Sequence, residues 1–316
     1  MKGFDKIKKQ YRDSLKSMDT EEPIDLMFYR PLGYLWALLC SKIGVTPNVI
    51  TIASIFLGVG GGVLLYFHGD MLWLNYVGIF LIIWANTFDS ADGQLARMTK
   101  QYSKLGRILD GFSGDLWFVA IYFAICFRIN EVDPVFAAQP WLIWVIASFA
   151  GLFHAKQASI ADYYRQFHLY FLKDEATSEL DNSKAIDAKL GELSWLKNFW
   201  PKLMMFCYRY YTASQEKVSP YMQLLRGELN HRFGGNVPQS FRDAFREKSK
   251  PLMKYANMLT FNTRIIVLFI SVIIKMPYIY FLFELTVLNI LLVYMIKRHE
   301  GICDKFIEEL YEGKYQ

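Results

Sequence analysis

The sequence predicts an all-α integral membrane protein with six transmembrane helices, an N-terminal interfacial amphipathic helix and a cytoplasmic helical insertion. The first observation is composition: 53% of the 316 residues are hydrophobic, 17% are aromatic and only 21% are charged. A soluble domain usually carries about 25% charged residues. The second observation is a series of apolar runs, several of which approach the roughly 20 residues that a helix needs to cross the hydrocarbon core. The third is an unequal distribution of lysine and arginine between the loops.

Six apolar runs are candidate spans. They cover residues 49–67, 71–91, 116–129, 141–160, 265–274 and 278–296. The third run can extend back to Leu105, and the fifth is short unless its helix begins near Pro251. A tight turn is expected between the last two runs, because Lys275, Met276 and Pro277 separate them.

Lysine and arginine concentrate at one end of these runs. They gather in the N-terminal segment, between the second and third runs, after the fourth run and in the C-terminal tail, while the opposite loops hold almost none. Cytoplasmic loops carry the excess of positive charge in membrane proteins. Both termini are therefore expected in the cytoplasm, in agreement with an even number of spans. The first 22 residues are polar and lack an apolar core, so no signal peptide is expected.

A short amphipathic segment precedes the first run. Residues 22–44 mix aliphatic and aromatic side chains with Arg30 and Lys42, which predicts a helix lying in the membrane interface. Thr46 is then a suitable N-cap and Pro47 a suitable first residue for the first span.

A long polar stretch separates the fourth run from the fifth. Residues 167–254 are too polar to cross a membrane and predict a cytoplasmic helical insertion. Its aromatic and basic part, residues 195–211, is expected to contact the membrane surface rather than nucleic acid. The chain is expected to divide into residues 1–48, 49–166, 167–254 and 255–316. The four cysteines are widely spaced and predict free thiols without a disulfide or a zinc site.

Acidic residues gather where the second run ends, and a carboxylate at the end of a span is costly unless it has a function. Positions i, i+3, i+4, i+7 and i+8 share one face of an α-helix. Here they hold Asp89, Asp92, Gly93, Ala96 and Arg97. This face suits a diphosphate ester. Two carboxylates can hold hard divalent cations, two small residues let a bulky ligand approach the backbone, and the guanidinium can bind phosphate oxygens.

The start of the third span repeats this combination of a small residue and an acid. Gly106 and Asp110 are spaced i, i+4. If the two spans pack antiparallel across residues 98–105, Asp110 joins the two acids of the second span, and such a cluster can hold one or two metal ions. The alternative is purely structural pairing of the acids with Arg97 and Arg107, which leaves the intervening glycine and alanine unexplained.

The pattern Asp-x2-Asp-Gly-x2-Ala-Arg-x8-Gly-x3-Asp, from Asp89 to Asp110, resembles the signature of the CDP-alcohol phosphotransferase (CDP-alcohol phosphatidyltransferase) family. The pattern fixes seven identities without a gap. The Thr-Pro-Asn sequence before the first span, the interfacial helix and the six spans are also similar to that family. The resemblance covers approximately residues 24–165 and 255–300.

The resemblance implies roles for specific residues. Asp89, Asp92 and Asp110 would bind divalent metal, Mg²⁺ or Mn²⁺, as two ions. Gly93, Ala96, Arg97 and Gly106 would line the CDP site. A fourth aspartate of the family acts as the base on the acceptor hydroxyl, and family members commonly form homodimers.

The fourth aspartate is where this sequence departs from the family. The family spacing is Asp-x3-Asp, but position 114 is Gly114 and the acid is Asp115. Five residues along a helix turn the side chain by about 140°, against about 40° for four residues. A one-residue π-bulge, eased by Gly111 and Gly114, would turn Asp115 back. Otherwise another group, such as a water held by the metal, acts as the base. Asp115 is the preferred base.

The resemblance implies an enzyme of phospholipid synthesis. It would transfer a phosphatidyl group from CDP-diacylglycerol to the hydroxyl of a polar alcohol and release CMP, with its active site at the cytoplasmic face. Six spans favour CDP-diacylglycerol over a donor of the CDP-choline or CDP-ethanolamine type. The alternative from another class is a transporter or non-catalytic polytopic protein, which would place its acids near the bilayer midplane rather than at one mouth.

The acceptor is expected to carry a phosphate, because three cations, Lys156, Arg165 and Arg264, are expected near the same mouth. This favours inositol phosphate or glycerol phosphate over serine, and an inositol-type acceptor is preferred. His154 and Gln157 on the fourth span resemble inositol-lipid members of the family. The polar cluster around Lys156 is open to two interpretations, a packing feature or part of the acceptor site.

Overall fold

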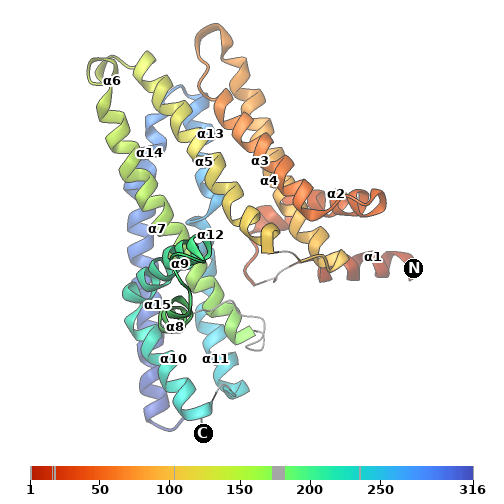
Figure 1. Ribbon diagram of the computed structural model, residues 1–316, viewed down its shortest axis with the longest axis vertical. Helices are drawn as coiled ribbons and strands as arrows, with labels where there is room; N and C mark the ends of the chain where they lie inside the picture. Colours follow the sequence, from red (N-terminus) through yellow and green to blue (C-terminus); the bar gives the residue numbers. More distant parts are fainter. Residues whose placement is uncertain are drawn as a thin grey trace. The chain divides into compact units, whose positions relative to one another are not determined.

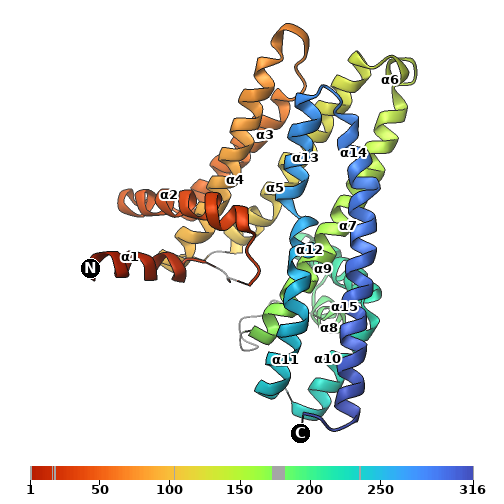
Figure 2. The same ribbon diagram turned by 180° about the vertical axis from the view of Figure 1, so that it is seen from behind.

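The computed structural model describes residues 2–15, 17, 19–102, 104–172, 182–234 and 236–315. These residues form helices and contain no strand. The helices are α1 (Lys2–Asp13), η1 (Asp25–Tyr29), α2 (Arg30–Ile43), α3 (Pro47–Leu64), η2 (Gly69–Met71), α4 (Trp73–Thr99), α5 (Lys104–Val132), α6 (Pro134–Ala138), α7 (Trp141–Leu172), α8 (Ser183–Glu192), α9 (Phe199–Val218), α10 (Pro220–Phe233), α11 (Gln239–Ser249), η4 (Lys250–Leu252), α12 (Met253–Met258), α13 (Phe261–Ile273), α14 (Tyr278–Leu285) and α15 (Val287–Tyr311) (Figures 1 and 2).

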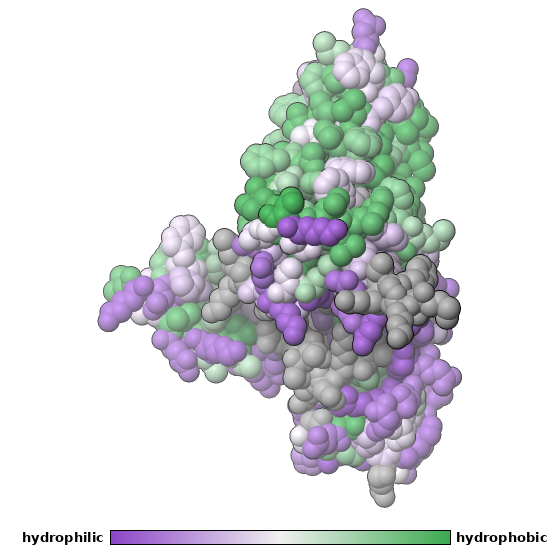
Figure 3. All heavy atoms as spheres, turned by 90° about the vertical axis from the view of Figure 1, so that its right-hand side faces the viewer, coloured by the Kyte–Doolittle hydropathy of each residue, from purple (hydrophilic) through white to green (hydrophobic). Residues whose placement is uncertain are grey.

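Five helical segments within the described residues are long and apolar enough to cross a membrane. They are Pro47–Leu64, Gly69–Thr99, Gly111–Val132, Gln239–Ile273 and Tyr278–Tyr311. The fourth expected span falls in α7, where His154, Lys156 and Gln157 interrupt the apolar run. The chain is thus a polytopic membrane protein, but the expected number of six spans is not confirmed. Figure 3 shows a broad area of hydrophobic side chains on one face of the molecule, as contact with lipid requires.

The chain forms two compact units. The first comprises Met1–Gly151 with Arg264–Phe283, and the second Leu152–Thr263 with Glu284–Gln316. In the first unit α3 packs against both α4 and α5, and glycines allow the close approach. A Cβ atom on Gly58 would collide with the Trp117 indole, and one on Gly61 would collide with the carbonyl oxygen of Gly78. Gly58 and Gly61 therefore allow the helices to pack closely, whereas a Cβ on Gly60 would meet open space.

A buried arginine joins three helices of the first unit. Arg128 on α5 is only 3% exposed. Its Nη1 donates to Asn75 Oδ1 of α4 at 2.8 Å and to the Leu65 carbonyl, just after α3, at 3.1 Å. Asn75 in turn donates to the Leu64 carbonyl at 2.9 Å. A buried charge needs such partners, because an unpaired one is strongly destabilising.

The expected amphipathic segment before the first span is helical. The exposed side chains of Leu35, Leu39 and Ile43 follow one another at intervals of four residues on α2, so they form one apolar stripe. Thr46 and Pro47 occupy the N-cap and the first position of α3 as expected, but the Thr46 side chain makes no capping hydrogen bond.

Helices of the expected insertion pack against α7 and α15 in the second unit. The insertion contributes α8 to α11, while residues 173–181 and 235 lie outside the described residues. Glu300 of α15 accepts a hydrogen bond of 2.7 Å from the backbone N–H of Tyr221, in the first turn of α10. The Tyr164 ring of α7 stacks on His299 with their centroids 3.9 Å apart. These contacts hold α7, α10 and α15 together.

Candidate functional site

The acidic face of α4 is held in place by α3. The helix is regular from Trp73 to Thr99, so the predicted stripe of Asp89, Asp92, Gly93, Ala96 and Arg97 lies along one side. Asp92 is buried at 3% exposure, and Asp89 is half-buried. The hydroxyl Oγ1 of Thr51, itself buried in α3, donates to Asp92 Oδ2 at 2.5 Å. A buried carboxylate is thereby fixed in direction by a neighbouring helix.

A serine on α5 makes the matching contact with the other acid. Ser113 Oγ donates to Asp89 Oδ1 at 2.8 Å, and Ser113 is buried. The first turns of α5 therefore approach the last turns of α4, as the antiparallel arrangement requires. Asp110 belongs to α5, but its side chain lies outside the described residues.

The predicted nucleotide-site residues of α4 lie next to the part of the chain that precedes α3, called the N-terminal segment below. A Cβ atom on Gly93 would be 3.4 Å from both terminal nitrogens of Arg97, so the guanidinium covers this glycine. Arg97 Nε donates to the Ser14 carbonyl, and Gln94 Nε2 donates to Ser14 Oγ at 3.2 Å. Ala96 and Gly106 are half-buried. The spacing pattern within α4 does not indicate that Ser14, 83 positions away in the chain, contacts Arg97.

The N-terminal segment binds a second stripe of α4 beside the acidic one. The polar side chains of Asn86, Ser90 and Gln94 follow at i, i+4 and i+8. Tyr29 is hydrogen-bonded to Asn86, and Arg30 Nη1 donates to Ser90 Oγ at 3.1 Å. Burial raises the pKa of Tyr29, and the bond to Asn86 opposes the rise. The regular polar spacing within an apolar span was the signal that could have revealed this contact.

Asp115 points away from the face that contacts α4. All described residues of α5 are α-helical, so the helix contains no π-bulge. Asp115 is exposed and lies two residues beyond buried Ser113, a rotation of about 200° around the helix. Neither Gly111 nor Gly114 packs closely, since a Cβ atom on either would meet nothing within 4 Å.

The three predicted acceptor-site cations have separate surroundings. Lys156 Nζ donates to the Ser214 carbonyl at 2.8 Å and to its hydroxyl at 2.9 Å. Arg165 Nη2 donates to Asn257 Oδ1 at 3.0 Å. Lys156 and Arg165 are nine residues apart on α7, so they point to opposite sides of that helix, about 180° apart. Arg264 is fully buried and belongs to the first unit.

The polar residues beside Lys156 form a buried network with α14 and α15. His154 Nδ1 is 3.0 Å from Glu284 Oε1, and Glu284 is fully buried. Gln157 Nε2 donates to the Glu284 carbonyl at 3.0 Å and to Asn289 Oδ1 at 2.8 Å. The sequence did not single out Glu284, because nothing in the spacing connects it to α7.

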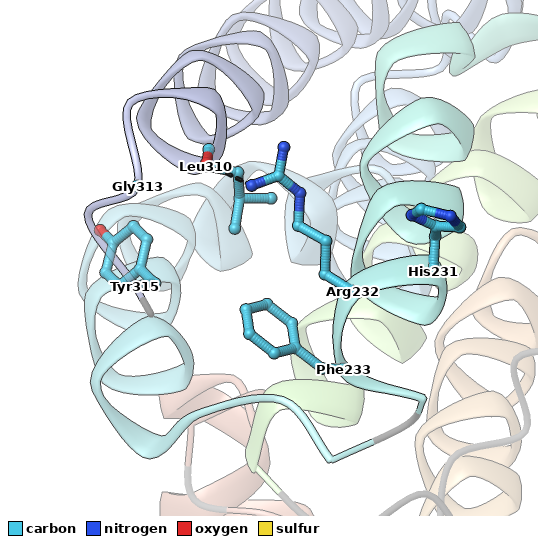
Figure 4. A pocket seen from close by; sticks show the side chains of 6 residues that line it. All are labelled: His231, Arg232, Phe233, Leu310, Gly313 and Tyr315. Carbon is cyan, nitrogen blue, oxygen red and sulfur yellow. Dashed lines mark hydrogen bonds between the residues drawn. The ribbon is translucent and has the colours of Figure 1, made fainter.

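The second unit has two further features that the sequence did not indicate. Buried His299, Glu300 and Cys303 have ligating atoms within 4.8 Å of one another. This is a mixed nitrogen, oxygen and sulfur set, unlike the oxygen ligands that Mg²⁺ prefers. A pocket of about 290 Å³ lies where α10 ends beside the C-terminal residues. It is lined by His231, Arg232, Phe233, Leu310, Gly313 and Tyr315, and Arg232 donates to the Leu310 carbonyl at 2.6 Å (Figure 4).

Comparison with known proteins places a family match on the part of the chain that contains the acidic face of α4. Residues 44–163 match the family model described as CDP-alcohol phosphatidyltransferase. The matched region contains α3, α4 and α5, and with them Thr51, Asp89, Asp92 and Ser113.

Three curated relatives are similar to part of this chain. A phosphatidylinositol phosphate synthase from Corynebacterium glutamicum is 33% identical over 126 residues, which is 40% of this chain and 46% of the relative. A CDP-diacylglycerol–glycerol-3-phosphate 3-phosphatidyltransferase from Cereibacter sphaeroides is 35% identical over 98 residues, 31% of this chain and 40% of the relative. A CDP-alcohol phosphatidyltransferase class-I family protein from Dictyostelium discoideum is 33% identical over 72 residues, 21% of this chain and 18% of the relative. The chain thus spans less than half the length of each relative, and no solved structure matches it significantly.

Proposed function

We propose that this chain, which carries a CDP-alcohol phosphatidyltransferase domain at residues 44–163, transfers a phosphatidyl group from CDP-diacylglycerol to the hydroxyl of a polar alcohol and releases CMP. The observation that carries the proposal is the acidic face of α4. Asp89 and Asp92 are fixed by hydroxyls from two different helices, with Gly93 and Arg97 beside them. A structural ion pair does not require this arrangement of oriented acids next to a glycine and a guanidinium.

The carboxylates fit a divalent metal. Asp89 and Asp92 offer oxygen donors, the ligand type that Mg²⁺ and Mn²⁺ take in proteins. Asp110, three residues before Ser113 on α5, completes the proposed set, which resembles sites that hold two ions. The metal would supply positive charge to offset the charge on the diphosphate. Thr51 and Ser113 keep the acids directed toward it, the role that outer-shell hydrogen bonds play around metal ligands.

The nucleotide end of the donor is proposed to lie along Gly93, Ala96, Arg97 and Gly106. Small side chains at three of these positions leave the helix backbone accessible, and a guanidinium binds phosphate oxygens through two parallel N–H groups. Arg97 Nε is engaged by the Ser14 carbonyl, so its remaining nitrogens are the ones proposed to meet the donor. The N-terminal segment then forms one wall of the nucleotide site.

Asp115 is proposed as the base that takes the proton from the acceptor hydroxyl. Its exposure gives access to an acceptor from the aqueous side, but its direction on α5 requires a local change of helical register. Gly111 and Gly114 support that change: glycine in a helix interior costs about 1 kcal/mol relative to alanine, and neither is needed for packing. The alternative is that a water held by the metal takes the proton.

The acceptor is proposed to be a phosphorylated polyol, with inositol phosphate preferred over glycerol phosphate, and unphosphorylated inositol or serine as alternatives. The names of two relatives support a phosphate on the head group. The predicted cations Lys156, Arg165 and Arg264 are the candidates for binding it. Lys156, whose Nζ donates to Ser214, also fits the packing interpretation. The charge bias of the loops supports an active site and both termini on the cytoplasmic side, and a homodimer is proposed by resemblance.

Product identification with a panel of acceptors tests this function. Purified protein in lipid nanodiscs would be given CDP-diacylglycerol, Mn²⁺ and one of inositol phosphate, glycerol phosphate, inositol or serine. We expect equimolar CMP and one new phospholipid, with inositol phosphate the best acceptor. A best rate with glycerol phosphate would keep the chemistry and change the acceptor. No lipid product with any acceptor, despite a folded protein, would contradict the proposal.

A further inference from the structure

Residues 195–211 carry an apolar and basic surface that the second unit leaves uncovered. The stretch contains three cations and no acidic residue: Lys197, Lys202 and Arg209. Five of its large hydrophobic side chains are at least half exposed: Leu196, Phe199, Trp200, Met204 and Tyr210. An exposed apolar area of this kind marks contact with a partner or a lipid surface.

The exposed side chains gather on one side of α9. On a helix that turns about 100° per residue, an arc of about 140° holds Phe199, Trp200, Met204 and Tyr210. The exposed thiol of Cys207 falls within the same arc. Lys202 and Arg209 lie within about 20° of each other on the other side. The first three turns of α9 are therefore amphipathic, with aromatic rings on one side and cations on the other.

The basic side of α9 faces α8. Arg209 Nε is 2.9 Å from Asp187 Oδ1 of α8, and Lys202 Nζ donates to the Leu193 carbonyl at 2.6 Å. Both cations also lie over aromatic rings, Lys202 over Trp195 and Arg209 over Tyr210. Because α8 takes the basic side, the apolar arc is turned away from α8.

The last turns of α9 are attached where α7 reaches the end of its apolar run. Gln215 Nε2 donates to the Ser159 carbonyl at 2.9 Å, and Lys156 donates to the Ser214 carbonyl at 2.8 Å. Both α7 residues belong to the last two turns of the run at residues 141–160. The end of an apolar run marks the level at which a helix leaves the hydrocarbon core. If α7 crosses the membrane as its apolar run predicts, the attachment of α9 is at the height of the membrane surface.

We propose that residues 195–211 lie in the interface of a bilayer that contains anionic phospholipids. The apolar arc of α9 would enter the boundary between head groups and acyl chains, where tryptophan and tyrosine are favoured. Exposed Lys197 would lie beside the lipid phosphates, while Lys202 and Arg209 stay bonded to α8. The absence of acidic residues from the stretch favours an anionic lipid surface over a protein partner of mixed charge. The second unit is thereby anchored to the membrane through its insertion as well as through its spanning helices.

Cys207 provides a native probe for this proposal, because it is exposed while Cys40, Cys126 and Cys303 are buried. A nitroxide attached to Cys207 would be measured by electron paramagnetic resonance in nanodiscs of phosphatidylcholine alone and with phosphatidylglycerol. Accessibility to oxygen reports lipid, and accessibility to a water-soluble nickel chelate reports the aqueous phase. We expect protection from nickel in the mixed lipid. The control is Cys207→Ser with Glu247→Cys, whose side chain is 77% exposed on polar α11, and its label should stay accessible to nickel in both lipids.

Variants that remove a positive charge or an aromatic ring from residues 195–211 test the two parts of the proposal separately. Lys197→Gln should lower the ratio of lipid-embedded to aqueous label by about fivefold in the mixed lipid. Trp200→Gln should lower that ratio in both lipids. Equal access to nickel at Cys207 in both lipids would overturn the proposal. So would protection accompanied by spin–spin broadening between labels, because that result assigns the surface to a second copy of the chain.

Discussion

At the scale of single residues, each acid of the α4 face depends on a hydroxyl from another helix. Thr51 reaches Asp92 from α3, and Ser113 reaches Asp89 from α5. The spacing rules that identify the acids act within one helix. They identify the carboxylates but give no information about partners 41 or 24 positions away in the chain. Only the packing of α3 between α4 and α5 reveals them.

Thr51→Val keeps the shape of the side chain and removes its hydroxyl. The loss of an outer-shell partner typically costs 10- to 100-fold in metal affinity or activity. We expect the Mn²⁺ concentration for half-maximal CMP release to rise about tenfold, with little change in the melting temperature. Thr51→Ser restores the hydroxyl and should return the Mn²⁺ dependence close to that of the wild type. An unchanged Mn²⁺ dependence in Thr51→Val would show that the hydrogen bond has no role in holding the acid.

Asp115 is the residue at which helical geometry and family pattern disagree. If it is the base, Asp115→Asn should lower kcat by about 100-fold or more, the usual contribution of a general base. Asp115→Glu should keep part of the activity, and Mn²⁺ affinity should be normal in both variants. Turnover near the wild-type rate in both would remove Asp115 from the mechanism and leave the proton to another group.

At the scale of elements, α5 contains glycines that its packing does not explain. Gly111 and Gly114 lie next to Asp115, and alanine at either position would meet no neighbour. A flexible helix turn there would let Asp115 move into register with the acidic face. The sequence pattern shows that Asp115 is out of register with the acidic face. It does not predict whether this turn of α5 changes its register, because a bulge depends on bound ligand and on neighbouring helices.

The double variant Gly111→Ala with Gly114→Ala tests this flexibility. Alanine favours the helix by about 1 kcal/mol per position, so the melting temperature should rise. If catalysis needs the register change, kcat should fall at the same time while Mn²⁺ affinity stays normal. Gly227→Ala in α10 is the matched control, because its Cβ also meets open space and the residue is far along the chain from the site. A stabilised double variant with full kcat would rule out a register change at these glycines.

The elements themselves were more predictable than their contacts. Long apolar runs predicted α3, α4 and α5, and the turn at Lys275 separates α13 from α14 as expected. The regular spacing of the polar residues Asn86, Ser90 and Gln94 could have indicated that another segment contacts this side of α4, but not which segment. That segment, with Ser14, Tyr29 and Arg30, is placed by tertiary packing, which the periodicity of a single helix does not show.

At the scale of the whole molecule, composition was enough to predict the class of protein. The chain has 53% hydrophobic and 21% charged residues, and the part of it that the structure describes folds into helices of which five are suited to cross a membrane. The count of six was harder to predict, since His154, Lys156 and Gln157 interrupt the apolar run of α7. Their partners Glu284, Asn289 and Ser214 lie in other helices, so the sequence of α7 alone could not show how its polar groups are satisfied.

The central claim is that the acids of α4 carry metal-dependent phosphatidyl transfer. CMP release from CDP-diacylglycerol by protein in nanodiscs, with the preferred acceptor and increasing Mn²⁺, measures it most directly. We expect Mn²⁺-dependent release by the wild type, a loss of at least 100-fold in Asp89→Asn and Asp92→Asn, and normal release in Asp70→Asn, an exposed acid before α4. Folded Asp89→Asn and Asp92→Asn variants that release CMP at the wild-type rate, or a wild type that releases none, would contradict the claim.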